Sequence, residues 1–324
     1  MLSISDNQKC DLAFLFFRHH IEFVFILLFN SHMINRIFPI YSSWLKNAKT
    51  LKELPSKCLA VNTGSTAGYN AFDYNLWKVN GANLGFSPQP LYYDFEMLKK
   101  YSNHIAENAT VFICLEHFKF YLNFYDDVKA DYKYYFWLDN NQIRTFNKTT
   151  NWLLHRAPIF LTYKELFSFL KKILKKILLR DLNKKFDNTE ANDIENSKLM
   201  TEGWNKEFGW ENGQFVTEDQ LKTISIVENR LIDMIDYCVN NNWSPCIVVL
   251  PLSPNLKKRL SDNVMNPGLW EPLKRIKRLR NVKVIDYYND ERFAHWQLYN
   301  NALSLNDKGR ILFNNLVQQT IFQN

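Results

Sequence analysis

Ser65 is the residue whose type and position most directly suggest chemistry. It follows Gly64 at the end of an apolar run, in the stretch LAVNTGSTAGYNAF at 59–72. A serine between a buried strand and a helix lies where a nucleophile would have to lie, because ligands of open parallel sheets bind outside the carboxyl ends of the strands. The same hydroxyl could instead cap the helix, or help its N-terminus bind an anion such as a phosphate or a carboxylate sugar. All three roles stay open for Ser65.

Polar residues also follow the other runs that predict strands: Gly85 and Ser87, Glu116 and His117, Ser253, and Asp290 with His295. His295 and His117 are the candidate general bases, and Asp290 precedes His295 on the same connection. Glu116 and His117 form no simple relay, because adjacent side chains of an extended chain point to opposite faces. The histidines and the five cysteines show no metal-ligand spacing. No metal site and no cofactor are predicted.

Five short apolar runs predict the strands that must position these residues. The runs are 58–62, 81–85, 110–115, 245–251 and 282–286. Four of them are nearly continuous in apolar residues, which is typical of strands covered on both faces of a parallel sheet. Helical patterns lie between them, at 67–78, 90–106, 218–242 and 266–280. This alternation predicts a doubly wound α/β sheet. We expect a three-layer α/β/α flavodoxin-like domain with five parallel strands in the order 2-1-3-4-5.

A long insertion interrupts the alternation between the third and fourth strands. We expect an N-terminal helical arm at 1–50 and one α/β domain at 51–324, with the insertion at 117–216. Within it, 187–198 predicts a flexible loop and 201–215 an ordered loop. Aromatic residues of the insertion could stack on sugar rings or fill a core. They are Tyr132, Tyr134, Tyr135, Trp137, Trp152, Trp204 and Trp210.

Three blocks in sequence order carry a resemblance to a known family. They are GSTAGYNAFDY after the first strand, NLGFSPQPLYYD after the second, and NALSLNDKGR before a C-terminal helix. Over roughly 50–320 the chain resembles the SGNH (GDSL-type) hydrolase superfamily. More narrowly it resembles the branch found in polysaccharide and capsule biosynthesis, whose members add or remove acyl groups on glycans. The resemblance implies that Ser65 is the nucleophile and that the Thr66 and Gly85 amides stabilise the oxyanion.

The last block departs from the family pattern at two catalytic positions. Where the family has Asp-x-x-His, this sequence has Asn301 and Ser304. A serine at the base position cannot accept a proton near neutral pH, so the usual triad is incomplete. An asparagine that the family carries after the third strand also has no clear equivalent.

Three functions stay open at this point. The first is a serine-dependent O-acetyltransferase or esterase acting on a bacterial surface polysaccharide or its precursor, with His295 or His117 as a relocated base. The second is a catalytically degenerate protein that binds a glycan or lipid-linked sugar in a polysaccharide biosynthesis complex. The third is transfer of a phosphorus-containing group to a glycan, using the basic surface and the helix that follows Ser65.

Charge and apolar segments restrict the partners and the location. The net charge of +7 and the pI of about 9.0 favour anionic partners. No basic motif of a known nucleic-acid module occurs, so no nucleic-acid partner is predicted. The resemblance implies a glycan or glycolipid and an acyl donor as partners. The apolar segment 12–29 is interrupted by charged residues, among them Arg18 and Glu22. In 163–186, leucine and isoleucine recur at helical spacing on one face, and lysine and arginine lie on the opposite face. Both suit a packed or membrane-surface helix better than a span. A cytoplasmic protein is expected, with peripheral contact at the inner membrane as an open alternative.

Overall fold

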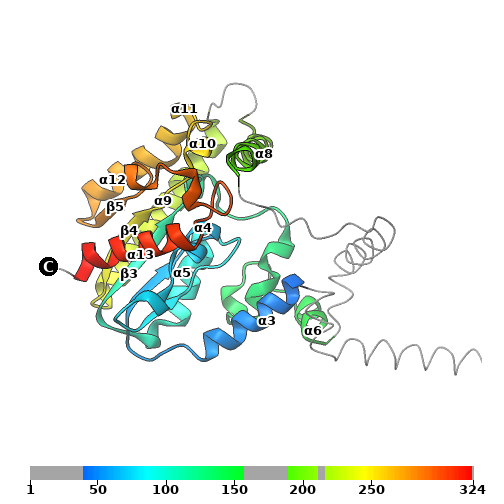
Figure 1. The fold of residues 1–324 in the computed structure, drawn as a ribbon. Coiled ribbons are helices and arrows are strands. Elements are labelled where there is room, and N and C mark those ends of the chain that lie inside the picture. Colours follow the sequence, from blue (N-terminus) through cyan, green and yellow to red (C-terminus); the bar gives the residue numbers. More distant parts are fainter. Residues whose placement is uncertain (1–38, 157–188, 211–215, 323–324) are drawn as a thin grey trace, which may run out of the picture. The chain divides into compact units, whose positions relative to one another are not determined.

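The sheet has five strands, all parallel, in the order β2-β1-β3-β4-β5 (Figure 1). The structure is a computed structural model that describes residues 39–156, 189–210 and 216–322. The strands are β1 (Cys58–Thr63), β2 (Gly81–Asn83), β3 (Ile105–Leu115), β4 (Ser244–Val249) and β5 (Lys283–Asp286). The five predicted strands are confirmed, although β3 begins earlier than its apolar run. The central strands are buried on both faces, as the apolar runs require.

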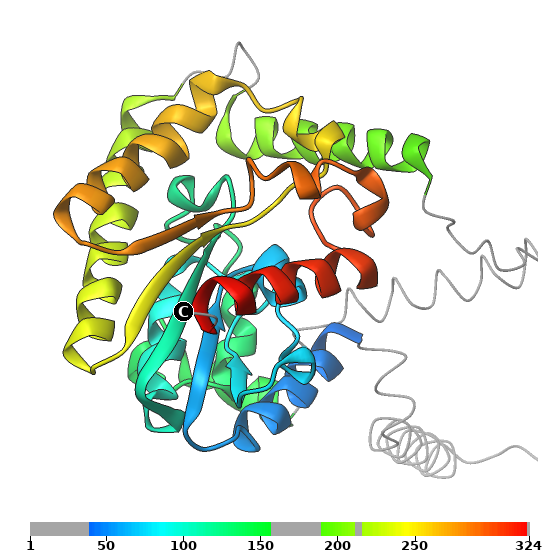
Figure 2. The same ribbon diagram turned by 60° about the vertical axis from the view of Figure 1, so that its left-hand side comes forward.

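Helices cover both faces of this sheet (Figures 1 and 2). On one face α5 (Leu91–Lys100) contacts α9 (Glu218–Asn240), which in turn contacts α12 (Glu271–Leu279). On the other face α4 (Thr66–Ala71) contacts α13 (Asp307–Phe322). The predicted three-layer flavodoxin-like fold is therefore confirmed. Short helical segments fill the connections: η1 (Tyr74–Leu76), η2 (Ser102–His104), η3 (Lys119–Tyr121), α10 (Pro254–Lys257), α11 (Asp262–Met265), η6 (Asn266–Trp270), η7 (Glu291–Phe293) and η8 (Trp296–Leu298).

The described residues form two compact units. One comprises 39–53 and 131–156, and the other comprises 54–130, 189–210 and 216–322 and holds the sheet. The smaller unit contains α3 (Pro39–Lys52), most of η4 (Val128–Phe136), η5 (Asn140–Gln142) and α6 (Lys148–Arg156). In it the Tyr41 hydroxyl donates to the Leu154 carbonyl at 2.9 Å, and the Trp137 indole N–H donates to the Trp44 carbonyl at 3.1 Å. Part of the expected insertion thus packs with residues that precede β1.

The helix α8 (Glu190–Phe208) stands where loops were predicted at 187–198 and 201–215, and that prediction is wrong for the described residues. Thr189 caps its start by accepting from the Asn192 N–H at 3.3 Å, and Gly209 ends it with φ 68°. Its buried residues are Asp193, Ser197 and Thr201. They are spaced four residues apart and so lie on one face of the helix. Because they are polar, the sequence lacks the apolar residues at helical spacing that usually predict a helix.

Two predicted membrane-surface segments, 12–29 and 163–186, lie outside the described residues. Within the described ranges, no helix combines the length and the apolar character that crossing a bilayer requires.

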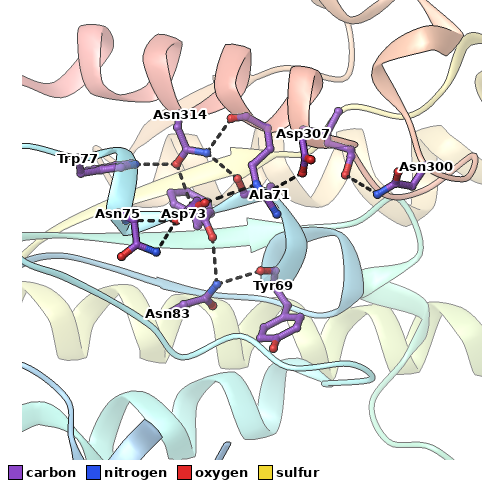
Figure 3. Close-up of polar contacts among 12 residues, drawn as sticks. Tyr69, Ala71, Asp73, Asn75, Trp77, Asn83, Asn300, Asp307 and Asn314 are labelled. Carbon is purple, nitrogen blue, oxygen red and sulfur yellow. Dashed lines mark hydrogen bonds and ion pairs between the residues drawn. The ribbon is translucent and has the colours of Figure 1, made fainter. Parts of the chain in front are cut away.

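Asn314 ties α13 to the segment that follows α4 (Figure 3). Its side-chain oxygen accepts from the Trp77 indole N–H at 2.6 Å and from the Asp73 N–H at 3.1 Å. Its side-chain nitrogen donates to the carbonyls of Ala71 and Arg310 at 2.8 and 2.7 Å. Asn314 is completely buried, so water could not replace its hydrogen bonds to these groups if the side chain were removed.

We expect Asn314→Leu to lower the free energy of unfolding by about 2–4 kcal/mol, because it strands several buried polar groups. The neighbouring Asn315 is exposed on the same helix, and Asn315→Leu is the matched control. Urea denaturation of the full chain measures both. Equal losses in the two variants would contradict the role given to Asn314.

Candidate functional site

The turn between β1 and α4 holds Ser65 at the carboxyl end of the sheet. Gly64 has φ 133°, a conformation that favours glycine, and a Cβ atom there would lie 2.7 Å from the Cβ of Cys114 on β3. Gly68 also faces Cys114: a Cβ atom on Gly68 would lie 2.9 Å from the Cys114 Cβ atom. The chain therefore turns sharply against β3, and Ser65 becomes the residue before the first turn of α4.

The hydroxyl of Ser65 is enclosed rather than exposed. The residue is 1% exposed, and its oxygen accepts from the Gln89 N–H at 3.1 Å. The phenol of Tyr125 lies beside it. Burial raises the pKa of Tyr125, so this phenol stays protonated at neutral pH. Although Ser65 stands at the N-cap position, its side chain makes no capping bond to α4.

A buried ammonium lies between two buried carboxylates beside this turn. Lys119, on η3, is 2.6 Å from Asp94 Oδ2 and 3.8 Å from Glu116 Oε2. Lys119 and Asp94 are completely buried, and Glu116 is 1% exposed. The Lys119 ammonium also donates to the Gln89 carbonyl at 2.8 Å. We call Asp94, Glu116 and Lys119 the charged cluster.

The charged cluster fixes the backbone that carries Ser65. Asp94 Oδ1 accepts from the Gly64 N–H at 2.8 Å and from the Gln89 side-chain amide at 2.7 Å. Glu116 Oε1 accepts from the Gly68 N–H at 3.4 Å. Two of the backbone N–H groups around Ser65 thus point at carboxylates. These N–H groups point into the protein, toward the charged cluster, rather than toward a ligand.

Burial shifts the pKa values of the cluster in opposite directions for the ammonium and for the carboxylates. Burial lowers the pKa of Lys119, but Asp94 and Glu116 together raise it by more, so its pKa lies above the ordinary value and it stays charged. Burial is also the main reason that the pKa of Glu116 is raised. The Lys119 ammonium is the group that makes two buried carboxylates tolerable at this position.

Thr66 and Gly85, the predicted oxyanion donors, lie where the turn after β1 contacts the turn after β2. The Gly85 N–H donates to the Asn83 side chain at 3.0 Å, so it already has a partner. A Cβ atom on Gly85 would lie 2.8 Å from the Gly64 carbonyl, which the Phe86 N–H bonds at 3.0 Å. Thr66 contributes its hydroxyl, 2.6 Å from that of Ser87.

His117, one candidate base, is buried among aromatic rings. Its ring centroid is 4.3 Å from that of Trp204 on α8 and 4.9 Å from that of Phe118. Neither ring nitrogen hydrogen-bonds to any described residue, Ser65 included. Burial lowers the pKa of His117 to about 3, so the imidazole is neutral at ordinary pH.

The second candidate pair, His295 and Asp290, is not assembled. Asp290 accepts from the guanidinium of Arg292 through both oxygens, at 2.9 Å from Nε to Oδ1. This hydrogen bond lowers the pKa of Asp290. His295 is exposed at the start of η8, and its side chain forms no hydrogen bond within the described part of the chain.

The positions that correspond to the family's Asp and His serve the loop before α13. Asn301 accepts from the N–H groups of Leu303 and Ser304 at 3.0 and 2.9 Å. The Ser304 hydroxyl accepts from the side chain of Asn70 on α4 at 3.3 Å. Ser304 therefore lies beside the helix that Ser65 begins, in a structural role.

Four residues around Ser65 escaped the sequence reasoning: Gln89, Asp94, Lys119 and Tyr125. Gln89 and Asp94 lie inside the block NLGFSPQPLYYD, so their segment was noticed but not their side chains. No sequence signal distinguishes Lys119, because lysines are mostly exposed. Of the aromatic residues proposed to bind sugars, Tyr134, Tyr135, Trp137 and Trp210 are buried, and Trp152 is 59% exposed.

Among the described residues, no group of histidine, cysteine and carboxylate side chains could hold a metal ion. Cys58, Cys114, Cys238 and Cys246 are buried free thiols, and Cys10 lies outside the described residues. No model of a known protein family and no curated protein matches this chain.

Replacing Lys119 by methionine should lower the free energy of unfolding by about 3–5 kcal/mol, because it leaves two buried carboxylates without a cation. Lys222 provides the control, since its ion pair with Asp219 lies at the surface and Lys222→Met should cost less than about 1 kcal/mol. Chemical denaturation compares the two variants. A cost for Lys119→Met no larger than for Lys222→Met would show that the ammonium does not stabilise the cluster.

His117 should make the chain less stable in acid. Its pKa is lowered from 6.5 to about 3 in the folded chain, so between these values the unfolded chain binds more protons. The free energy of unfolding therefore falls as the pH falls from about 6.5, with a slope approaching 1.4 kcal/mol per pH unit from this residue. His117→Leu should remove that slope between about pH 6 and pH 4.

Denaturant unfolding at several pH values measures this effect, with the exposed His295→Leu as the control that keeps the wild-type slope. Parallel pH profiles for the wild type and His117→Leu would refute the assignment.

Proposed function

We propose that this chain is a non-catalytic protein with an SGNH-like fold that binds a glycan or lipid-linked sugar in a polysaccharide biosynthesis complex. The observation that carries the proposal is the enclosure of the Ser65 hydroxyl: the residue is 1% exposed, and its oxygen accepts from the Gln89 N–H at 3.1 Å. A nucleophilic serine must offer its oxygen to the substrate and hydrogen-bond to a base that takes its proton. The Tyr125 phenol beside it is protonated, with a raised pKa, and cannot take that proton.

The other candidate catalytic groups have structural partners as well. The Gly85 N–H bonds Asn83, and the Asp290 carboxylate bonds Arg292. Asn301 holds the N–H groups of the loop before α13. Each of these groups would have to give up its partner before it could act on a substrate, which favours a binding role over a chemical one.

A glycan is supported as the ligand by fold-level resemblance and by charge. The carboxyl edge of a flavodoxin-like sheet is the usual ligand edge, and the resemblance points to the polysaccharide branch of the superfamily. The net charge of +7 favours an anionic partner. A lipid-linked sugar precursor and an acidic polysaccharide both meet this description.

A serine O-acetyltransferase or esterase remains the competing function, and the placement of Ser65 after β1 favours it. It requires a rearrangement that withdraws Tyr125 and brings a base to the serine oxygen. The third function, transfer of a phosphorus-containing group, requires an anion at the start of α4. There the Gly64 and Gly68 N–H groups face carboxylates instead.

The proposal predicts that the full chain forms no covalent adduct with a fluorophosphonate, measured by intact mass, under conditions in which a serine esterase reacts completely. It also predicts that Ser65→Ala binds alginate as the wild type does in affinity gel electrophoresis. An adduct that is lost in Ser65→Ala and kept in Ser87→Ala would establish a reactive Ser65 and refute the non-catalytic assignment.

A further inference from the structure

An open pocket of about 370 Å³ lies between η8 and the first turn of α13. It is lined by Trp296, Gln297, Asn300, Asn306, Asp307 and Lys308. The first four belong to the connection from β5 to α13, which also contains Asn301 and Ser304, and Asp307 and Lys308 begin α13. Figure 3 shows Asn300 on the loop before α13 and Asp307 at the start of that helix. The pocket is within the size range of small-ligand sites.

The frame of this pocket is rigid before any ligand arrives. The Asn306 side chain donates to the Gln297 carbonyl at 2.6 Å and accepts from the Gly309 N–H at 3.1 Å. A Cβ atom on Gly309 would lie 2.2 Å from the Leu298 carbonyl, so only glycine lets α13 approach η8 this closely. The buried Tyr299 hydroxyl anchors the loop through the Leu252 carbonyl at 2.8 Å. A preorganised frame reduces the entropy that ligand binding would otherwise lose.

The surface of the pocket has the chemistry that recognises a sugar ring. Trp296 is partly exposed, and its indole forms no ring contact and no hydrogen bond with any other described residue. Gln297 adds an exposed amide, which can donate to and accept from hydroxyl groups. The Asn300 amide is exposed too; its nitrogen donates to the Leu305 carbonyl at 3.4 Å, and its oxygen can accept from a hydroxyl group. An aromatic face with a few polar groups around it binds the apolar face and the hydroxyls of a pyranose together.

The charge of the pocket favours an acidic sugar. The Asp307 carboxylate is already paired, because Arg310 donates to it at 2.8 Å. Lys308 is exposed and makes no ion pair or hydrogen bond with the described residues. Arg310 also lies 3.6 Å from Asp73, so it serves two carboxylates, whereas the ammonium of Lys308 has no carboxylate partner among the described residues. Lys308 is therefore the positive charge of the pocket that a ligand can pair with. A carboxylate on the sugar would meet that charge.

We propose that this pocket binds one uronic-acid ring of an anionic polysaccharide, stacked on Trp296 with its carboxylate at Lys308. The proposal rests on the glycan-binding function proposed above and assigns it a site and a sugar class. It places recognition on Trp296 and Lys308, neither of which belongs to the family's catalytic blocks.

Affinity gel electrophoresis of the full chain tests the proposal with two probes, alginate as a polyuronate and dextran as an uncharged polyglucose. We expect alginate to retard the wild type more strongly than dextran does. Trp296→Ala should weaken alginate binding about tenfold, while Trp296→Phe keeps most of it because a ring remains. Lys308→Gln should weaken alginate binding several-fold and reduce its salt dependence.

Two matched controls exclude general effects of surface and charge. Trp152→Ala removes an exposed tryptophan of the smaller unit, and Lys277→Gln removes an exposed lysine of α12. Both should bind alginate as the wild type does, and all variants should keep the wild-type melting temperature.

The outcomes separate the two proposals. If alginate retards the wild type and Trp296→Ala equally, the glycan site lies elsewhere and only the pocket assignment is overturned. If dextran binds as strongly as alginate and Trp296→Ala loses both, the pocket takes neutral sugars and the uronate assignment is overturned. If neither polysaccharide retards the wild type, the pocket proposal is overturned, and the glycan function loses its support as well.

Discussion

The ion pair between Lys119 and Asp94, 2.6 Å apart and shielded from solvent, is the constraint on which the ligand edge of this protein depends. Charges are tolerated in an interior only when each has a partner in good geometry. Lys119 of η3 pairs with Asp94 of α5, and Asp94 in turn accepts from the Gly64 N–H. The Lys119 ammonium thus fixes the turn that carries Ser65 through Asp94.

This rigidity has a direct bearing on function. The Gly64 and Gly68 N–H groups donate to buried carboxylates, so they are not free to stabilise an oxyanion, and the serine hydroxyl accepts from the Gln89 N–H. The connection before α13 is different. Its backbone is held by hydrogen bonds, but Trp296 and Lys308 at the open pocket make no hydrogen bond or ion pair with the described residues through their side chains.

Much of the fold could be predicted because parallel strands covered on both faces must be apolar throughout, and 110–115 and 245–251 meet that demand. The failures have equally physical causes. The helix α8 buries Asp193, Ser197 and Thr201, so its inner face has the right spacing but not the apolar character. The helical pattern at 67–78 is divided because Phe72 turns to an extended conformation and ends α4 early.

The sequence by itself determined the layer architecture and the arrival of Ser65 at the carboxyl end of β1, because these follow from local periodicity and from chain order. Only the tertiary structure decided what surrounds Ser65. The Gln89 N–H donates to it from the connection after β2, and Lys119 of η3 holds the Gln89 carbonyl in turn. The positions of these groups depend on how separate elements pack. Hydrophobic patterns record which face of an element is covered, but they do not record which distant polar group will cover it.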